Sequence, residues 1–216
     1  MPRYLIFDLD GTLIDSCAIC VEILSAMLAE RGSTHVIDPQ TARPWMSVGG
    51  AQMVAALLGP ACGDPDAEIA EFRRRYAIMQ TRADSLFADV ADGLARLHNA
   101  GHKLAICSNK PQNLVENVLR DTGLGGLFTS VVGARAGVPT KPALDLLTIV
   151  LADLGVALDQ CLFIGDSEID HQLADAAGIP FLFVTYGYAH ADYVAPEDSF
   201  DHFAALTSAI LAGHHA

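Results

Sequence analysis

Patterns typical of buried strands and of amphipathic helices alternate along most of this 216-residue chain. Short apolar runs bounded by Gly, Asp or Asn predict buried strands, and apolar residues recurring every three or four positions predict helices. The predicted strands are 4–7, 103–107, 130–134, 161–164 and 181–184. The predicted helices are 90–100, 111–122, 142–154, 168–177 and 199–212. This alternation predicts an α/β fold with a parallel sheet covered by helices on both faces.

The segment between Asp15 and Ser85 differs, because it shows helical periodicity and no convincing strand pattern. One helix is expected from about residue 16 to Gly32, a second after Gly49 and Gly50, and a third from about 66 to 83. Pro39 and Pro44 bracket a short segment between the first two. The sequence therefore predicts a helical insertion over residues 16–87, with a core formed by 1–15 and 88–216.

Composition limits the possible partners. The chain is 51% hydrophobic, so it can form a large core. Its formal net charge of −13 argues against binding to nucleic acids or anionic membranes, because both require positively charged protein surfaces. No apolar run approaches the roughly 20 residues of a membrane-spanning helix. Arg3 and Asp8 interrupt the apolar start, so no signal peptide is expected. We expect a cytoplasmic monomer or homodimer whose partner is a small molecule.

The five cysteines fit a reducing compartment. Cys17 and Cys20 form a C-x-x-C pair, for which a redox role is one interpretation. A zinc site would need two further ligands at metal-binding spacing, and none accompanies them. Two small apolar residues on a helix are the favoured interpretation.

Charged and hydrogen-bonding side chains follow four of the predicted strands: Asp8 and Asp10, Ser108 and Asn109, Lys141, and Asp166 and Asp170. The carboxyl ends of parallel strands lie at one edge of the sheet, so these side chains should converge there. Carboxylates bind Mg²⁺, attack phosphorus and transfer protons, and a lysine offsets the charge of a transferring phosphoryl group. Each residue alone fits an ordinary turn or helix start; their joint placement predicts phosphoryl transfer.

Four stretches carry a resemblance to a known family: Asp8-x-Asp10-Gly11-Thr12-Leu13, Ser108-Asn109, Lys141-Pro142, and Gly165-Asp166-x-x-x-Asp170. In order and spacing they resemble the motifs of the haloacid dehalogenase-like hydrolase superfamily. Residues 11–16, 108–111 and 184–188 are similar to its phosphoglycolate phosphatase-like branch. The resemblance implies a Rossmann-like core with a mobile helical cap domain at 16–87.

The resemblance also implies roles for the motif residues. Asp8 would be the nucleophile and a Mg²⁺ ligand, and Asp10 would be the general acid/base and would bind the metal through its backbone carbonyl. Asp166 would be the other protein ligand of the metal. An acid at position 10 favours phosphatase over dehalogenase activity.

The remaining implied roles concern binding and support. Ser108, Asn109 and Lys141 would bind the phosphate. Asp170 would support the metal site or orient Lys141, and Gly11 would let the backbone approach the ligand closely.

Substrate contacts are expected from the insertion. Arg43 could meet a substrate carboxylate, and Gly49 and Gly50 could let the backbone approach the substrate; a surface arginine and an ordinary loop are equally open interpretations. The run from Arg73 to Arg75 is expected to be a solvated helix face. Ala88 stands where relatives often have a proline, which leaves the stiffness of the second hinge open.

The expected activity is Mg²⁺-dependent hydrolysis of a small phosphorylated metabolite through an aspartyl phosphate, with phosphoglycolate as the best single candidate. A phosphomutase or phosphotransferase acting on a sugar phosphate would use the same residues and stays open. A phospho-accepting signalling module also gathers such residues at strand ends, but the helical insertion argues against it.

Overall fold

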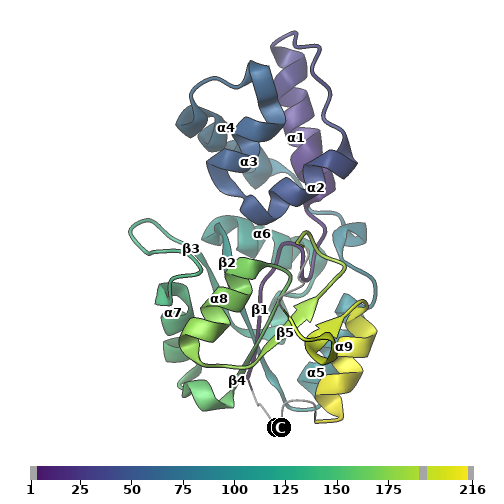
Figure 1. Ribbon diagram of the computed structural model, residues 1–216, viewed down its shortest axis with the longest axis vertical. Coiled ribbons are helices and arrows are strands. Elements are labelled where there is room, and N and C mark those ends of the chain that lie inside the picture. Colours follow the sequence, from purple (N-terminus) through teal and green to yellow (C-terminus); the bar gives the residue numbers. More distant parts are fainter. Residues whose placement is uncertain (1–3, 190–193, 214–216) are drawn as a thin grey trace.

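The computed structural model describes residues 4–189 and 194–213 and contains one parallel sheet (Figure 1). The six strands lie in the order β3-β2-β1-β4-β5-β6, and every neighbouring pair is parallel. Their bounds are β1 Tyr4–Phe7, β2 Lys103–Pro111, β3 Phe128–Ala134, β4 Cys161–Gly165, β5 Phe181–Val184 and β6 Ser199–Phe200. The predicted α/β fold is confirmed.

Strand β1 lies in the interior of the sheet, and its residues alternate between the two faces. Leu5 and Phe7 belong to one apolar cluster and Ile6 to the other, and all three are fully buried. The first cluster includes α5 (Val90–Asn99), α6 (Gln112–Thr122) and α9 (Phe203–Leu211); the second includes α7 (Asp145–Leu154) and α8 (Glu168–Ala177). Burial on both faces explains why β1, β4 and β5 are almost entirely apolar.

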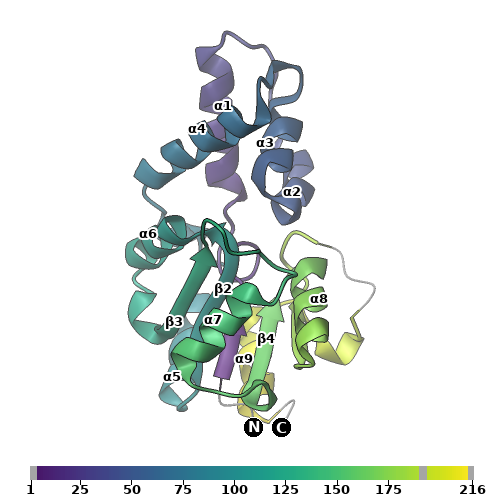
Figure 2. The same cartoon turned by 90° about the vertical axis from the view of Figure 1, so that its left-hand side faces the viewer.

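Four helices pack together above the carboxyl ends of the strands (Figures 1 and 2). They are α1 Cys17–Glu30, α2 Pro39–Val48, α3 Gly50–Leu58 and α4 Pro65–Ile78. We call these four helices the cap. The helical insertion is thus present, and the domain boundaries at 16 and 87 stay a prediction.

The two segments that join the cap to the core run side by side. Ile14 and Leu86 form an antiparallel bridge, and the amide of Asp15 donates to the carbonyl of Ser85 at 2.7 Å. A second hydrogen bond, from the amide of Phe87 to the carbonyl of Leu13, measures 3.1 Å. The chain therefore enters and leaves the cap at one place.

Some predicted element boundaries were wrong. The segment bracketed by prolines is helix α2, because Asp38 accepts hydrogen bonds from the amides of Gln40 and Thr41 and Pro39 stands in the first turn. Helix α4 ends at Ile78 rather than near 83. The last helix begins at Phe203 rather than 199, since residues 199–200 pair with β5 as β6.

Candidate active site

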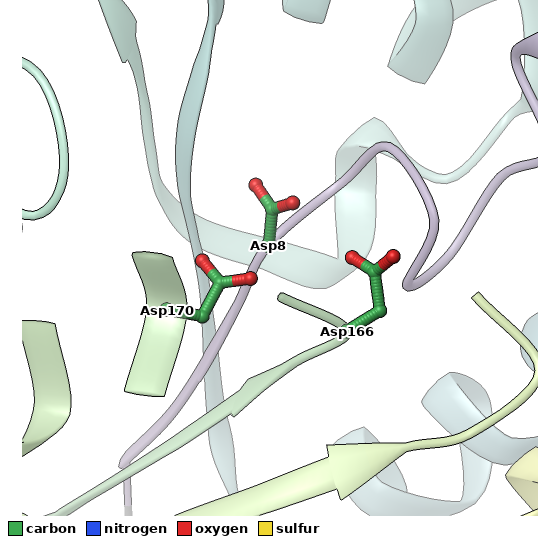
Figure 3. A group of neighbouring side chains, drawn as sticks. All are labelled: Asp8, Asp166 and Asp170. Atoms are coloured by element: carbon green, nitrogen blue, oxygen red, sulfur yellow. The ribbon is translucent and has the colours of Figure 1, made fainter. Parts of the chain in front are cut away.

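Three buried carboxylates converge beneath the cap (Figure 3). Asp8 directly follows β1, Asp166 directly follows β4, and Asp170 lies in the first turn of α8. One oxygen from each of the three lies within 4.8 Å of the others. The predicted convergence of strand ends therefore brings these three residues together.

Lys141 lies between two of these carboxylates. Its Nζ atom donates to Oδ1 of Asp8 at 2.7 Å and to Oδ1 of Asp170 at 2.6 Å, and the lysine is itself buried. Of the two roles considered for Asp170, the structure shows the contact with Lys141. A single buried cation thus contacts two of the three acids.

Asn109 holds the backbone of Lys141 in place. Its Nδ2 atom donates to the carbonyl of Lys141 at 3.0 Å, and its Oδ1 atom accepts from the amide of Lys141 at 2.8 Å. The side chain that was expected to bind phosphate is therefore engaged with Lys141. The buried hydroxyl of Ser108 accepts from the amide of Lys110 at 3.3 Å, which leaves its own proton available to a phosphate oxygen.

Asp166 is fixed by a tight backbone environment. Its Oδ2 accepts from the amide of Tyr188 at 2.8 Å, and its Oδ1 accepts from the hydroxyl of Thr12 at 3.3 Å. Gly11 has a φ of +85°, and a Cβ atom there would overlap the Asp166 carboxylate. Gly187 approaches the same side chain from the other loop. At Gly11 the backbone thus approaches the Asp166 side chain closely, and its predicted approach to a ligand stays a prediction.

The electrostatics of these acids favour a bound cation. Burial raises the pKa of Asp8 to about 6; Lys141 opposes this rise and Asp170 adds to it. Burial, then the charges of Asp170 and Asp8, raise the pKa of Asp166 well above its ordinary value. Three buried carboxylates against one lysine leave excess negative charge, and their hard oxygens are the ligands that Mg²⁺ prefers. The donor set therefore fits a divalent cation.

Asp10 has a basic partner that the sequence interpretation missed. The Nζ atom of Lys110 lies 3.0 and 3.2 Å from the two carboxylate oxygens of Asp10. The same Nζ lies 4.1 Å from the centre of the Tyr76 ring, which comes from α4 of the cap. Burial alone would lower the pKa of Lys110, but Asp10, Tyr76 and Cys20 together outweigh burial and raise it. Lys110 directly follows Ser108 and Asn109, so its place near the carboxyl end of β2 was the available signal.

A cavity of about 320 Å³ separates the core from the cap. Its lining on the core side includes Asp8, Asp10, Ser108, Lys110, Lys141 and Asp166. Its lining on the cap side includes Gly49, Gly50, Met53, Phe72, Arg73 and Tyr76. This volume is at the lower end of the range for small-molecule sites.

The cap residues singled out in the sequence have different positions. Gly49 and Gly50 line the cavity, and their contact with substrate stays a prediction. Arg43 is not among the lining residues: it donates to Oδ2 of Asp15 at 2.6 Å and lies 5.2 Å from the centre of the Tyr188 ring. Arg73 lines the cavity, yet it is exposed, as is Arg74, so these two residues match the expected solvated helix face.

The C-x-x-C residues belong to the apolar core. Cys17 and Cys20 are both buried and free. Burial raises the pKa of Cys20 to about 12, so its thiol stays neutral and unreactive near neutral pH. Their placement matches the interpretation as small apolar helix residues.

Sequence and structure comparisons agree with this geometry. The family model described as haloacid dehalogenase-like hydrolase matches residues 5–184. The chain belongs to this family. It is 37% identical over 194 residues to the phosphoglycolate phosphatase of Xanthomonas campestris pv. campestris strain 8004, covering 88% of this chain and 86% of that protein. It is 34% identical to the phosphoglycolate phosphatase of Pectobacterium atrosepticum, over 98% and 93% of the two chains.

A solved structure shows the same fold. A haloacid dehalogenase-like hydrolase from Streptococcus pneumoniae superposes with a TM-score of 0.79 at 21% identity, covering 96% of this chain and 98% of that one. The family and the curated relatives together support phosphatase activity. None of the helices in the described part of the chain is both long and apolar enough to cross a membrane.

Proposed function

We propose that this chain is a Mg²⁺-dependent phosphomonoester hydrolase that acts on a small phosphorylated metabolite through an aspartyl phosphate. The observation that carries the proposal is the placement of Asp8 beside Lys141, with Asp10 two residues later, all lining one cavity. The names of the curated relatives make phosphoglycolate the first substrate to test.

In the first step, an oxygen of Asp8 attacks phosphorus and the bond from phosphorus to the leaving oxygen breaks. Asp10 donates its proton to that oxygen, so that the alcohol departs neutral. Lys141, within 2.7 Å of Asp8, lies where it can offset the charge of the transferring phosphoryl group. The hydroxyl of Ser108 donates to one of the phosphoryl oxygens.

In the second step, water attacks phosphorus of the aspartyl phosphate. Asp10, now a carboxylate, accepts the proton of that water, and the bond from phosphorus to the Asp8 oxygen breaks. Inorganic phosphate leaves and Asp8 is restored. Lys110 holds both oxygens of Asp10 within 3.2 Å, which positions this acid/base between the two steps.

Asp8, Asp166 and the backbone carbonyl of Asp10 are the groups that would hold Mg²⁺. When bound, the cation would neutralise negative charge on the phosphate and on the buried acids. The roles of the chain itself are to fix Asp166 through Tyr188 and Thr12 and to keep Asp8 ionised beside Lys141. The cap would exclude bulk water while the aspartyl phosphate exists.

The test is phosphate release by purified protein with Mg²⁺ from a panel of phosphomonoesters that includes 2-phosphoglycolate and hexose phosphates. We expect turnover by the wild type and none by Asp8→Asn with the fold retained in circular dichroism. Phosphate release from none of the panel would refute the proposal. Conversion of a hexose phosphate to an isomer, without free phosphate, would identify a mutase instead.

A further inference from the structure

Arg73 differs from the other arginines of the cap and its connections. Five of the six have a carboxylate partner: Arg31 with Glu68, Arg43 with Asp15, Arg74 with Glu71, Arg75 with Glu30, and Arg82 with Asp84, each at 2.6–2.7 Å. Within residues 4–189 and 194–213, no carboxylate forms an ion pair with Arg73. Arg73 is exposed, and Arg96 and Arg135 of the core also form no ion pair within the described residues, so the significance of Arg73 depends on where it lies.

The position of Arg73 suggests where its counterion comes from. Among the described residues that line the cavity, it is the one charged side chain contributed by the cap. The opposite wall carries Ser108 and Lys141, which bind the phosphate in the proposed function. A guanidinium facing a ligand cavity is well suited to a planar or tetrahedral anion.

Tyr76 provides an independent sign of a missing partner. It lies one turn beyond Arg73 on α4, so the two residues are neighbours on the helix surface. Tyr76 is 2% exposed and lines the cavity, and among the described residues no acceptor forms a hydrogen bond with its hydroxyl, since the nearby Lys110 ammonium can only donate. A buried hydroxyl without an acceptor is costly, so a ligand acceptor would satisfy it. The ring itself is fixed against Lys110 at 4.1 Å.

We propose that Arg73 and Tyr76 bind a second anionic group of the substrate, across the cavity from the phosphate. This inference rests on the proposed phosphatase function and narrows its substrate class to short phosphomonoesters that carry a carboxylate or a second phosphate. The cavity volume of about 320 Å³ favours a substrate of few atoms between the two anionic groups. A carboxylate is the first choice, because it satisfies a guanidinium and a phenol with its two oxygens.

The test compares substrates of similar size with and without the second anion. We would measure kcat/KM of the wild type, Arg73→Gln, Tyr76→Phe and Arg74→Gln on 2-phosphoglycolate, ethyl phosphate and a sugar bisphosphate. Arg73→Gln should lower kcat/KM about 10- to 100-fold for the dianionic substrate that the site accepts. It should change the value for ethyl phosphate less than about threefold. The ratio of kcat/KM for the dianionic substrate to kcat/KM for ethyl phosphate should therefore fall in Arg73→Gln. It should also fall in Tyr76→Phe, and it should not change in the exposed control Arg74→Gln.

The substrate whose kcat/KM falls distinguishes a carboxylate from a second phosphate. Equal losses for ethyl phosphate and 2-phosphoglycolate would mean a structural role and would overturn the inference. An unchanged ratio in Arg73→Gln would overturn it as well. Absence of phosphate release by the wild type from any substrate would instead refute the proposed function, so the two failures are distinct.

Discussion

The Nζ atom of Lys141 lies 2.7 Å from Oδ1 of Asp8, although 133 positions separate the two residues along the chain. The same Nζ lies 2.6 Å from Asp170, and all three side chains are buried. One lysine thus contacts both the proposed nucleophile and Asp170. Loss of either contact leaves a buried charge without compensation.

Replacement of Lys141 by Gln should therefore affect both stability and activity. We expect the free energy of unfolding to fall by about 3–5 kcal/mol, because two buried carboxylates lose their cation. We expect kcat to fall roughly 10²- to 10³-fold, the usual loss for one transition-state donor. Urea unfolding and phosphate release would measure the two effects. Lys103→Gln, at the exposed start of β2, is the matched control and should change neither; a fully stable, active Lys141→Gln would contradict the assignment.

The strand-end logic that predicted this pair has a clear limit. Asp8, Lys141 and Asp166 could be placed together because parallel strands must end at one edge. Lys110 could have been found from its place near the carboxyl end of β2, whereas the positions of Arg73 and of the Tyr76 hydroxyl could not be predicted, because they depend on how the cap packs against the core.

Local pattern also does not reveal a partner that lies far away along the chain, and the ligand contacts expected of such side chains stay predictions. Asn109 looked like a phosphate ligand by its position, yet its amide is engaged with the backbone of Lys141. Arg43 looked available to substrate, yet Asp15 is its partner. In both cases the partner is 28 or more positions away, beyond the reach of any helix or strand period.

The raised pKa of Asp8 predicts a pH dependence of stability in metal-free protein. Because the pKa rises from 3.8 to about 6 on folding, the folded chain binds this proton more tightly than the unfolded chain. The resulting stabilisation is complete below pH 3.8 and is lost as the pH rises through 6. At 1.36 kcal/mol per unit, two units correspond to about 3 kcal/mol.

Asp8→Asn removes this titration, so the comparison isolates it. In EDTA, the free energy of unfolding of Asp8→Asn minus that of the wild type should increase by about 2 kcal/mol between pH 4 and 7. Urea unfolding at several pH values would measure it. Carboxylates with a lowered pKa, such as Glu71, make the folded chain less stable as the pH falls. They contribute equally to both proteins, so their effect cancels in the difference. A difference that is flat with pH would contradict the raised pKa.

Mg²⁺ should stabilise the folded chain through Asp166. A ligand that binds only the folded state adds about 2.7 kcal/mol at a concentration 100 times its Kd. Asp166→Asn should lose most of this increment, whereas Asp159→Asn, an exposed acid before β4, should keep it. Thermal unfolding with Mg²⁺ and with EDTA would show the shift. An equal Mg²⁺ response in both variants would place the cation elsewhere.

A comparison of two glycines separates the energetic cost of backbone strain from the cost of a steric clash with a neighbouring side chain. Gly11 and Gly32 both have positive φ, at +85° and +64°, but only Gly11 has no room for a Cβ. Gly32→Ala should cost about 1–2 kcal/mol from backbone strain alone. Gly11→Ala should cost a further 1–3 kcal/mol, roughly, through displacement of Asp166, and should also lower activity. Equal costs in urea unfolding, with activity retained, would show that Asp166 tolerates the methyl group.

The pairing of Ile14 with Leu86 has a consequence for how such a protein diversifies. The four-helix insertion leaves the core and returns to it at one point, so it affects the sheet no more than a tight turn would. The helices of the cap can be exchanged, shortened or reshaped as a unit while the register of β1 and the position of Asp8 stay the same. Selection can therefore change which molecule enters the cavity without rebuilding the reaction that follows.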